Sequence, residues 1–386
     1  LRRDLIRVQG LFSAGRYDDG LTRAQAVLTA AESEGYPPLI AEAGVVVGRL
    51  ANQTGDFALA ERALERAFTD GGAIGADETA ATAALELVYA IGYGVQHHAE
   101  ALQWARAAEM LIRRIGQERG LLGATLLNNR GVVLAMRGSH DEARESLERA
   151  IEVRLAVLGP RHPRVIDSLG NLGEILRIRG DRDRAAEVQR QVLEQCEAVY
   201  GPDHPDTAVA LNNLAITYND LNEPARALPL LERALAVWQA ALGPQHVNVA
   251  NALTNLGNTR AMLGHNAEAL DDNARALAVW EAVAGPEHPR YAFALATRAV
   301  ILSRSGDLAG ARALLVRSIA VQEKALGADS PDVAATLASL ATLDIDRGAD
   351  AEALPSLERA LAIEERALPP DHPRIAVTLA RLGELL

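Results

Sequence analysis

Apolar and small residues along this chain recur at the spacing of a helix face, and the whole pattern returns every 42 residues. Between residues 163 and 178 these positions are Ile166, Leu169, Leu172, Gly173 and Leu176. Steps of three, three, one and three place the side chains on one side of an α-helix. The pattern therefore predicts a helix, here named helix A of the repeat, that buries this side against a neighbour.

A short turn sequence precedes each helix A. Its clearest copy is Gly159-Pro160-Arg161-His162-Pro163, and copies of varying quality begin at 201, 243, 285, 327 and 369. Proline in the first turn of a helix costs no hydrogen bond, because the N–H that it lacks has no partner there. We expect the linker histidines to be turn or capping residues: His162, His204, His246, His288 and His372. Equivalent atoms of stacked repeats are on the order of 10 Å apart, too far to share a metal ion.

A second helix, helix B, is predicted after a turn in each repeat. The turn residues are Gly138, Gly180, Asn222, Gly264, Gly306 and Gly348. Asparagine tolerates the left-handed conformation, so Asn222 indicates a left-handed residue at the end of helix A. Helix A carries Gly or Ala at 131, 173, 215, 257, 299 and 341, and helix B carries Ala at 143, 185, 227, 269, 311 and 353. Small residues at both places allow two antiparallel helices to pack closely.

Trp238 and Trp280 occupy equivalent positions on helix B, in line with Cys196. We expect the two indoles to cover the joint between adjacent repeats. The alternative is an outer patch for a partner or a second subunit. Cys196 in the same row is expected to be inert.

A fixed period in the range of about 20 to 50 residues is the sequence signature of a solenoid. We predict an all-α fold, an α-solenoid of stacked antiparallel helix pairs, with about nine pairs and a final helix. Residues 1–74 are expected to form divergent helix pairs, residues 75–368 regular 42-residue repeats, and residues 369–386 a final unpaired or truncated helix. Both ends look cut, so we expect a segment of a larger protein.

The charge balance restricts the class of partner. The formal net charge is −12, which argues against nucleic acid and against an anionic membrane surface, since both require a basic face. Cys196 is the sole cysteine, which excludes an intrachain disulfide and favours a cytoplasmic location. Lys324 is the only lysine, and this bias toward arginine indicates a GC-rich, bacterial genome. No apolar run is long enough to cross a bilayer.

The sequence offers no catalytic motif. The stretch 71–75 is rich in glycine but follows a predicted helix rather than a strand, so it does not indicate a phosphate loop. Neither the nucleophile elbow nor the paired motif of zinc hydrolases occurs. An open groove also lacks the water-excluding pocket that a catalytic group needs. We therefore expect no enzymatic activity, no cofactor and no metal.

The repeat resembles the tetratricopeptide repeat family, in its kinesin-light-chain type of 42 residues. The resemblance rests on the turn sequence and on two segments, Asn212-Asn213-Leu214-Ala215 and Leu231-Glu232-Arg233-Ala234-Leu235. It covers about 117 to 386 strongly and weakens before residue 75. The resemblance implies a right-handed superhelix that holds extended peptides or partner helices on a concave side formed by helix A.

A stripe on helix A, offset by one residue from the buried one, would face this concave side in the family. Its candidate ligand-binding residues grade from charged through polar to apolar: Asp167, Glu174 and Arg177, then Asn212, Asn219, Asn251, Thr254 and Asn258, then Phe293 and Val300. Amides can pair with both polar groups of a peptide unit. The alternative is that these side chains are merely solvated. Asn129, Asn171, Asn213 and Asn255 lie one residue further round and are interpreted as structural, bonding between helices.

Three hypotheses of function follow. The leading one is a protein-interaction scaffold that binds an extended peptide or helix along the concave face of helix A. In the second, the segment is a regulatory or sensor arm of a larger signalling enzyme, such as a bacterial Ser/Thr kinase or a caspase-like protease, whose catalytic domain lies outside these residues. The third is self-association through the solenoid ends.

Overall fold

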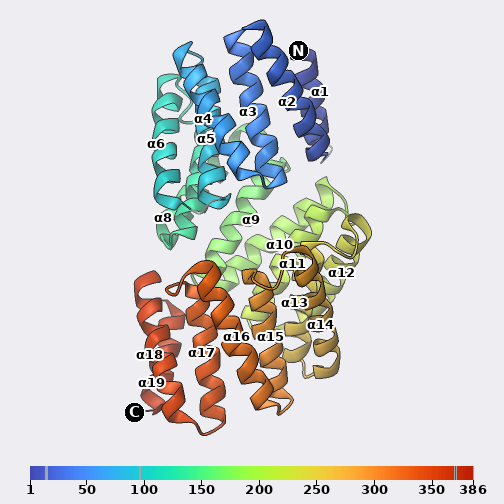
Figure 1. Ribbon diagram of the computed structural model, residues 1–386, viewed down its shortest axis with the longest axis vertical. Coiled ribbons are helices and arrows are strands. Elements are labelled where there is room, and N and C mark those ends of the chain that lie inside the picture. The colour runs from blue at the N-terminus through green and yellow to red at the C-terminus, as the bar shows by residue number, and fades with distance from the viewer. Residues whose placement is uncertain (14–15, 95–96, 369, 371, 386) are drawn as a thin grey trace. The chain divides into compact units, whose positions relative to one another are not determined.

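The computed structural model describes residues 1–13, 16–94, 97–368, 370 and 372–385 (Figure 1). Across these residues the secondary structure consists of nineteen α-helices and one π-helix, without a strand. The all-α prediction is confirmed: α1 to α18 follow one another as nine pairs, and α19 is a final helix. Two compact units result, Leu1–Ile175 and Leu176–Leu386. Of the last predicted linker, Pro369 and Asp371 lie outside the described residues.

The first unit contains eight complete α-helices, a π-helix and most of a ninth α-helix. They are α1 (Arg2–Ser13), α2 (Tyr17–Glu34), α3 (Pro37–Thr54), α4 (Phe57–Ala73), α5 (Asp77–Tyr89), η1 (Ala90–Gly94), α6 (His98–Arg114), α7 (Leu121–Met136), α8 (His140–Leu158) and α9 (Pro163–Ile178). Its core is built largely from Ala, Leu and Val of α3 to α7. The boundary at Ile175 falls inside α9, where no change in composition marks it.

The second unit holds the last turn of α9 and ten further helices. They are α10 (Arg182–Val199), α11 (Pro205–Asp220), α12 (Pro224–Leu242), α13 (Val247–Met262), α14 (Asn266–Val283), α15 (Pro289–Arg304), α16 (Leu308–Leu326), α17 (Pro331–Asp346), α18 (Asp350–Ala367) and α19 (Pro373–Leu385). From α9 to α19 the A helices are the odd-numbered ones, and each starts 42 residues after the last, as the linker spacing predicts.

The linker histidines cap the A helices. In His204, His246 and His288 the Nδ1 atom accepts a hydrogen bond, 3.1 Å long, from the backbone N–H two residues further on. His162 and His372 make the same bond at 3.1 and 3.2 Å. Where the linker has lost its histidine, the hydroxyl of Ser330 takes the same place. These contacts satisfy an N–H at a helix start, and they confirm the capping prediction.

The turns between the helices of a pair are also as predicted. Glycines at 138, 180, 264, 306 and 348 have positive φ, between 71° and 88°. Asn222 has φ of 59° and is the only residue other than glycine with positive φ in the described part of the chain. Its amide side chain tolerates the conformation that glycine adopts in the equivalent turns.

Helix A and helix B of a pair approach closely at the small residues. The alanines at 143, 185, 227, 269, 311 and 353 are fully buried. A Cβ added to Gly257 on α13 would lie 3.1 Å from the carbonyl oxygen of Ala269 on α14. A Cβ added to Gly131 on α7 would lie 2.9 Å from Leu147 Cγ on α8. A side chain larger than a methyl group cannot fit at these positions without displacing a neighbour.

One buried position of helix B differs from repeat to repeat. It holds Arg154, Cys196, Trp238, Trp280, Gln322 and Glu364, all nearly inaccessible to solvent. Trp238 packs in one apolar cluster with Val249 and Ala252 of the following repeat. The indole N–H of Trp238 donates to the carbonyl of Pro205 at 3.2 Å. The prediction that the tryptophans cover the joint between repeats is confirmed.

In two other repeats this buried position of helix B holds a charged residue that bonds to the next helix A. Arg154 donates to the carbonyl of Arg164 at 2.7 Å and to the hydroxyl of Ser168 at 2.6 Å. Burial lowers the pKa of the Arg154 guanidinium to about 10. Glu364 pairs with Arg374 at 3.3 Å and accepts from Thr378 at 2.7 Å. In both joints the partners lie ten and fourteen residues beyond the buried group, on the next helix A.

Substituting Gly257 tests the close approach of the two helices. We expect Gly257→Leu to lower the free energy of unfolding of the second unit by about 1–3 kcal/mol, because the added atoms collide with α14. Gly383→Leu is the matched control, since Gly383 holds the same repeat position on α19 and has no atom within 4 Å of an added Cβ. Urea unfolding followed by circular dichroism measures both. Equal losses in the two variants would contradict this account of the packing.

The His288 cap predicts a dependence of stability on pH. Burial, with a smaller effect of Arg290, lowers the pKa of His288 below its ordinary value of 6.5. The unfolded chain therefore takes up this proton first, so the free energy of unfolding falls as pH drops below about 6.5 and levels off below the folded-state pKa. His288→Ser keeps an acceptor, as Ser330 does, but cannot titrate. Urea titrations between pH 7.5 and 5 should show a shallower decline for this variant; parallel curves would refute the expectation.

Candidate binding surface

The A helices line the inner side of the second unit. Successive A helices contact each other directly: α11 with α13, α13 with α15, and α15 with α17. No contact of that extent joins successive B helices in the described part of the chain. Elements on the inside of a curved stack lie closer together than those on the outside, so the A helices form the concave face. The solvent-accessible residues of α11, α13, α15, α17 and α19 on that face are here called the inner surface.

Apolar side chains stand on the inner surface at one repeat position. Phe293 on α15 is 48% exposed and Val209 on α11 is 42% exposed, and Val377 on α19 is exposed as well. These three residues are separated by multiples of 42, so they occupy the same register on their helices. Asn251 of α13 shares that register and is half-buried, as are Asn258 and Val300 further along their helices. The surface thus carries both apolar groups and amides.

Two of the candidate residues are buried. Asn212 is 8% exposed and Thr254 is 2% exposed. The hydroxyl of Thr254 donates to the carbonyl of Ala250 in its own helix at 2.8 Å, so it has no free donor for a ligand. In their place Asn213 and Asn255, one residue further round, are partly accessible. At Asn213 of α11 and Asn255 of α13, the accessible side chain is therefore one residue away from the stripe that the sequence predicted.

Hydrogen bonds between A helices occupy several of the amides. Asn255 donates to Asn212 Oδ1 at 2.9 Å, and Asn219 donates to the hydroxyl of Thr259 at 2.8 Å. In the first unit Asn129 donates to the carbonyl of Leu85 at 3.0 Å and Asn171 to Asn128 at 3.4 Å. The interpretation as links between helices is confirmed for Asn129, Asn171 and Asn255, whereas Asn213 accepts from Asn212 of its own helix at 3.5 Å. Asn212, as an acceptor in this ladder, has a structural role that the sequence did not reveal.

The charged candidates divide between the two units. Asp167 is exposed and Glu174 half-buried, and both belong to the part of α9 in the first unit. Arg177, in the second unit, donates to Asp220 of α11 at 2.8 Å. Its charge is therefore partly used to hold α9 to α11.

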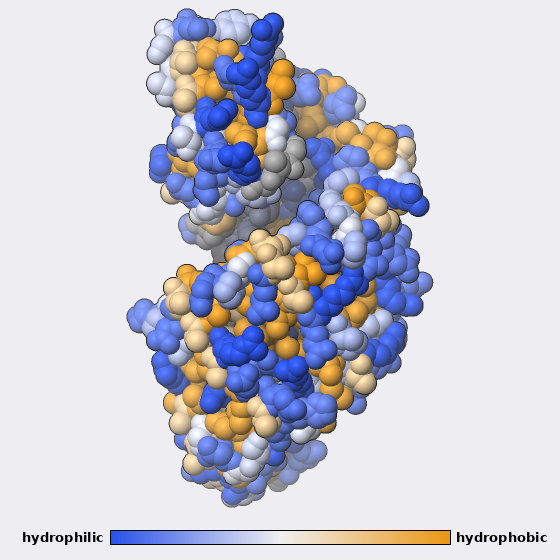
Figure 2. Space-filling view, turned by 90° about the vertical axis from the view of Figure 1, so that its right-hand side faces the viewer, coloured by the Kyte–Doolittle hydropathy of each residue, from blue (hydrophilic) through white to orange (hydrophobic). Residues whose placement is uncertain are grey.

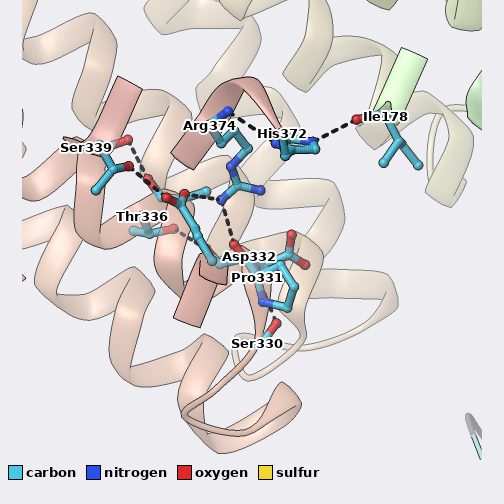
Figure 3. A network of polar contacts seen from close by, with 11 residues as sticks. Ile178, Ser330, Pro331, Asp332, Thr336, Ser339, His372 and Arg374 are labelled. Atoms are coloured by element: carbon cyan, nitrogen blue, oxygen red, sulfur yellow. Dashed lines mark hydrogen bonds and ion pairs between the residues drawn. The ribbon is translucent and has the colours of Figure 1, made fainter. Parts of the chain in front are cut away.

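The two ends of the second unit meet, as Figure 3 shows. His372, in the turn before α19, bonds through Nε2 to the carbonyl oxygen of Ile178 at 2.9 Å, across 194 residues of sequence. Pro373 lies against Gly180, where an added Cβ would be 3.0 Å from its Cγ. The helices from α10 to α18 therefore bring the chain back to its starting point, and the inner surface of the second unit follows a closed path.

The hydrogen bonds of His372 define its protonation. A carbonyl oxygen can only accept, so Nε2 carries the proton in the bond to Ile178. The Nδ1 atom accepts from the N–H of Arg374 and carries none. The neutral ring in this one tautomer thus does two things: it caps α19, and it joins the two ends of the second unit.

The end of the second unit leaves an apolar position uncovered. Leu379 on α19 is 49% exposed, whereas neighbouring helices bury the leucines at the equivalent position, which are Leu211, Leu253, Leu295 and Leu337. Self-association through this end therefore stays a prediction. On the face shown in Figure 2, hydrophobic residues are interspersed with hydrophilic ones and do not gather into one continuous patch.

Two searches of the described residues bear on other classes of site. No group of three or more His, Cys, Asp or Glu is placed so that it could hold a metal ion. No helix in the same residues is both long and apolar enough to cross a membrane.

Comparison with known families identifies the repeat. The family model of the tetratricopeptide repeat (TPR) matches residues 124–197, 168–239, 223–279, 266–324 and 294–366. These matches together span well over half of the chain, so the protein belongs to the tetratricopeptide repeat family. The resemblance read from the linker and helix patterns is confirmed. No curated protein shows significant sequence similarity to the chain.

Solved structures share the fold at low sequence identity. The apo form of RapI is 12% identical, with a TM-score of 0.65, over 95% of this chain and 99% of its own. A Rap protein complexed with competence and sporulation factor is 13% identical, with a TM-score of 0.58, over 100% of this chain and 96% of its own. A putative kinesin light chain of Podosopora anserina is 22% identical over 52% of this chain and 94% of its own, with a TM-score of 0.44.

Removing the His372 imidazole tests the closure of the second unit. We expect His372→Ala to broaden the distance distribution between spin labels at Arg182→Cys and Ala376→Cys and to shift it to longer distances, because the bond to Ile178 is lost. Both labelling positions are exposed, whereas the native Cys196 is buried. His246→Ala is the control, since it removes the same type of cap without a contact across the unit. Double electron–electron resonance measures the distances, and an unchanged distribution in His372→Ala would rule out the closure.

Proposed function

We propose that this TPR protein is a protein-interaction scaffold whose second unit binds an extended peptide segment of a partner protein along its inner surface. The observation that carries the proposal is Phe293, a large apolar side chain that is 48% exposed on the concave face. An aromatic group left half in water on a concave surface is a typical anchor point for a partner side chain. Val209 and Val377 repeat the exposure on the same register.

The amides beside these apolar positions supply hydrogen bonds to the backbone of the bound peptide. Asn251 and Asn258 are half-buried, and the only contact of the Asn258 amide in the described structure is a weak one, 3.9 Å from Met262 Sδ. Such an amide can donate to a peptide carbonyl and accept from a peptide N–H. Contacts to a peptide backbone hold a segment with little regard to its sequence, so Phe293 and Val300 would supply the selectivity.

The fold and the closed path are compatible with this mode of binding. A Rap protein, which shares the fold, forms a complex with competence and sporulation factor. An extended segment presents its polar groups along its whole length and can follow a curved row of A helices. Asp167 and Glu174 lie in the first unit, and Asn212 and Thr254 are buried, so the proposed surface consists of Asn219, Asn251, Asn258, Phe293 and Val300 with the partly accessible Asn213.

A matched pair of substitutions tests the proposal. Peptides selected by display on the immobilised protein are titrated by fluorescence anisotropy against Phe293→Asp and Val316→Asp. Val316 on α16 is 46% exposed, nearly the same as Phe293, but belongs to helix B. We expect Phe293→Asp to weaken binding at least about tenfold, which corresponds to about 1.4 kcal/mol, and Val316→Asp to leave it unchanged. The proposal would be wrong if Val316→Asp weakened binding more than Phe293→Asp did, or if the two variants bound with equal affinity.

A further inference from the structure

The first unit contains a separate pocket that the repeat pattern does not explain. It has a volume of about 370 Å³ and opens between α6 and α8, over α7. Leu102, Leu126 and Leu134 provide apolar walls, and Arg106, Arg130 and Arg137 provide three guanidinium groups. The pocket belongs to the first unit, whereas the inner surface is defined by helices of the second.

Arg130 stands where four of the five following repeats have a buried leucine. The equivalent positions, at intervals of 42, hold Leu172, Leu214, Leu256, Arg298 and Leu340, and all four leucines are buried. A leucine at 130 would fill apolar space between the helices, whereas the arginine brings a charge into it. Holding a charged group at a half-buried site is unfavourable unless something pairs with it.

No carboxylate pairs with the three arginines in the described part of the chain. Arg130 makes no hydrogen bond or ion pair there, while its counterpart Arg298 donates to the carbonyl of Leu270 at 3.4 Å. Arg106 contacts only the carbonyl of Leu102 in its own helix, and Arg137 only the hydroxyl of Ser139. The pocket therefore concentrates unpaired positive charge in a protein with a net charge of −12.

Two carboxylates also line the pocket, fewer than its three arginines, and neither pairs with them in the described structure. Glu109 lines the pocket but pairs with Arg113 at 3.3 Å, and Glu142 lies on the exposed rim without an ion pair in the described structure. At the start of α6, the pKa of His98 is lowered mainly by burial, with a smaller effect of the charge of Arg137.

We propose that this pocket binds a small amphiphilic anion, whose carboxylate or phosphate group pairs with Arg130 and whose apolar part contacts Leu102, Leu126 and Leu134. A planar guanidinium can donate two parallel hydrogen bonds to two oxygen atoms of a carboxylate or a phosphate. Arg106 and Arg137 add positive charge on either side. The leucine walls select an anion with a hydrocarbon portion over inorganic phosphate. The site is independent of the inner surface of the second unit.

Calorimetric titration with four simple probes tests the chemistry. Octanoate and octyl phosphate carry both features of the proposed ligand, octanol lacks the charge, and inorganic phosphate lacks the chain. We expect one-to-one binding of octanoate, octyl phosphate or both, and affinities at least about tenfold weaker for octanol and inorganic phosphate. The stronger of the two anions identifies the head group. If neither anion binds, or octanol binds equally well, the proposal is wrong.

The repeats themselves supply the variants. Arg130→Leu introduces the residue of the equivalent positions, so the fold should be kept, and the affinity for the anion should fall at least about tenfold. Arg298→Leu makes the same change at the same repeat position in the second unit and should not alter binding. Arg130→Leu should also raise the melting temperature without ligand, because it removes an unpaired charge from an apolar site. Undiminished anion binding by Arg130→Leu would overturn the assignment of the site.

Discussion

The fold depends on how closely helix A can approach helix B within a pair. At Gly257 an added Cβ would lie 3.1 Å from a carbonyl of the partner helix, and the facing alanines have no exposed surface. A solenoid has no central core, so each pair is held only by its own interface and by those to its neighbours. The distance between the two helices therefore helps to set the curvature of the stack. That curvature in turn determines which residues of helix A face the inner surface.

The features that the sequence predicted are those that a single repeat determines. The capping role of the linker histidines follows from turn chemistry, and the left-handed turn at Asn222 follows from its equivalence to five glycines. The burial of Trp238 and Trp280 follows from packing between adjacent repeats. Each of these depends on neighbours within about one repeat along the chain, and the 42-residue period makes such neighbours visible.

The features that escaped prediction depend on how many repeats combine. The contact of His372 with Ile178 results from the summed rotation of all the helices between them, which no local pattern encodes. Asn212 and Thr254 are buried, the former as an acceptor for Asn255 of the next helix A, and the accessible side chains beside them are Asn213 and Asn255. The role of Arg130 could not be predicted for another reason. An arginine at a leucine position indicates a site only when the equivalent leucines are known to be buried.

The variable joint between repeats bears on how such a chain avoids misfolding. Repeats that are nearly alike could dock in the wrong order, with one repeat skipped, because their helix faces are similar. Arg154 finds its acceptors in Arg164 and Ser168, whereas Glu364 finds its partners in Arg374 and Thr378. If either helix B docked on α11, α13 or α15, Ala210, Ala252 or Ala294 would stand in place of the hydroxyl partner, and the buried charge would lose a hydrogen bond. The joints thus penalise part of the wrong orders of assembly and so favour the native one.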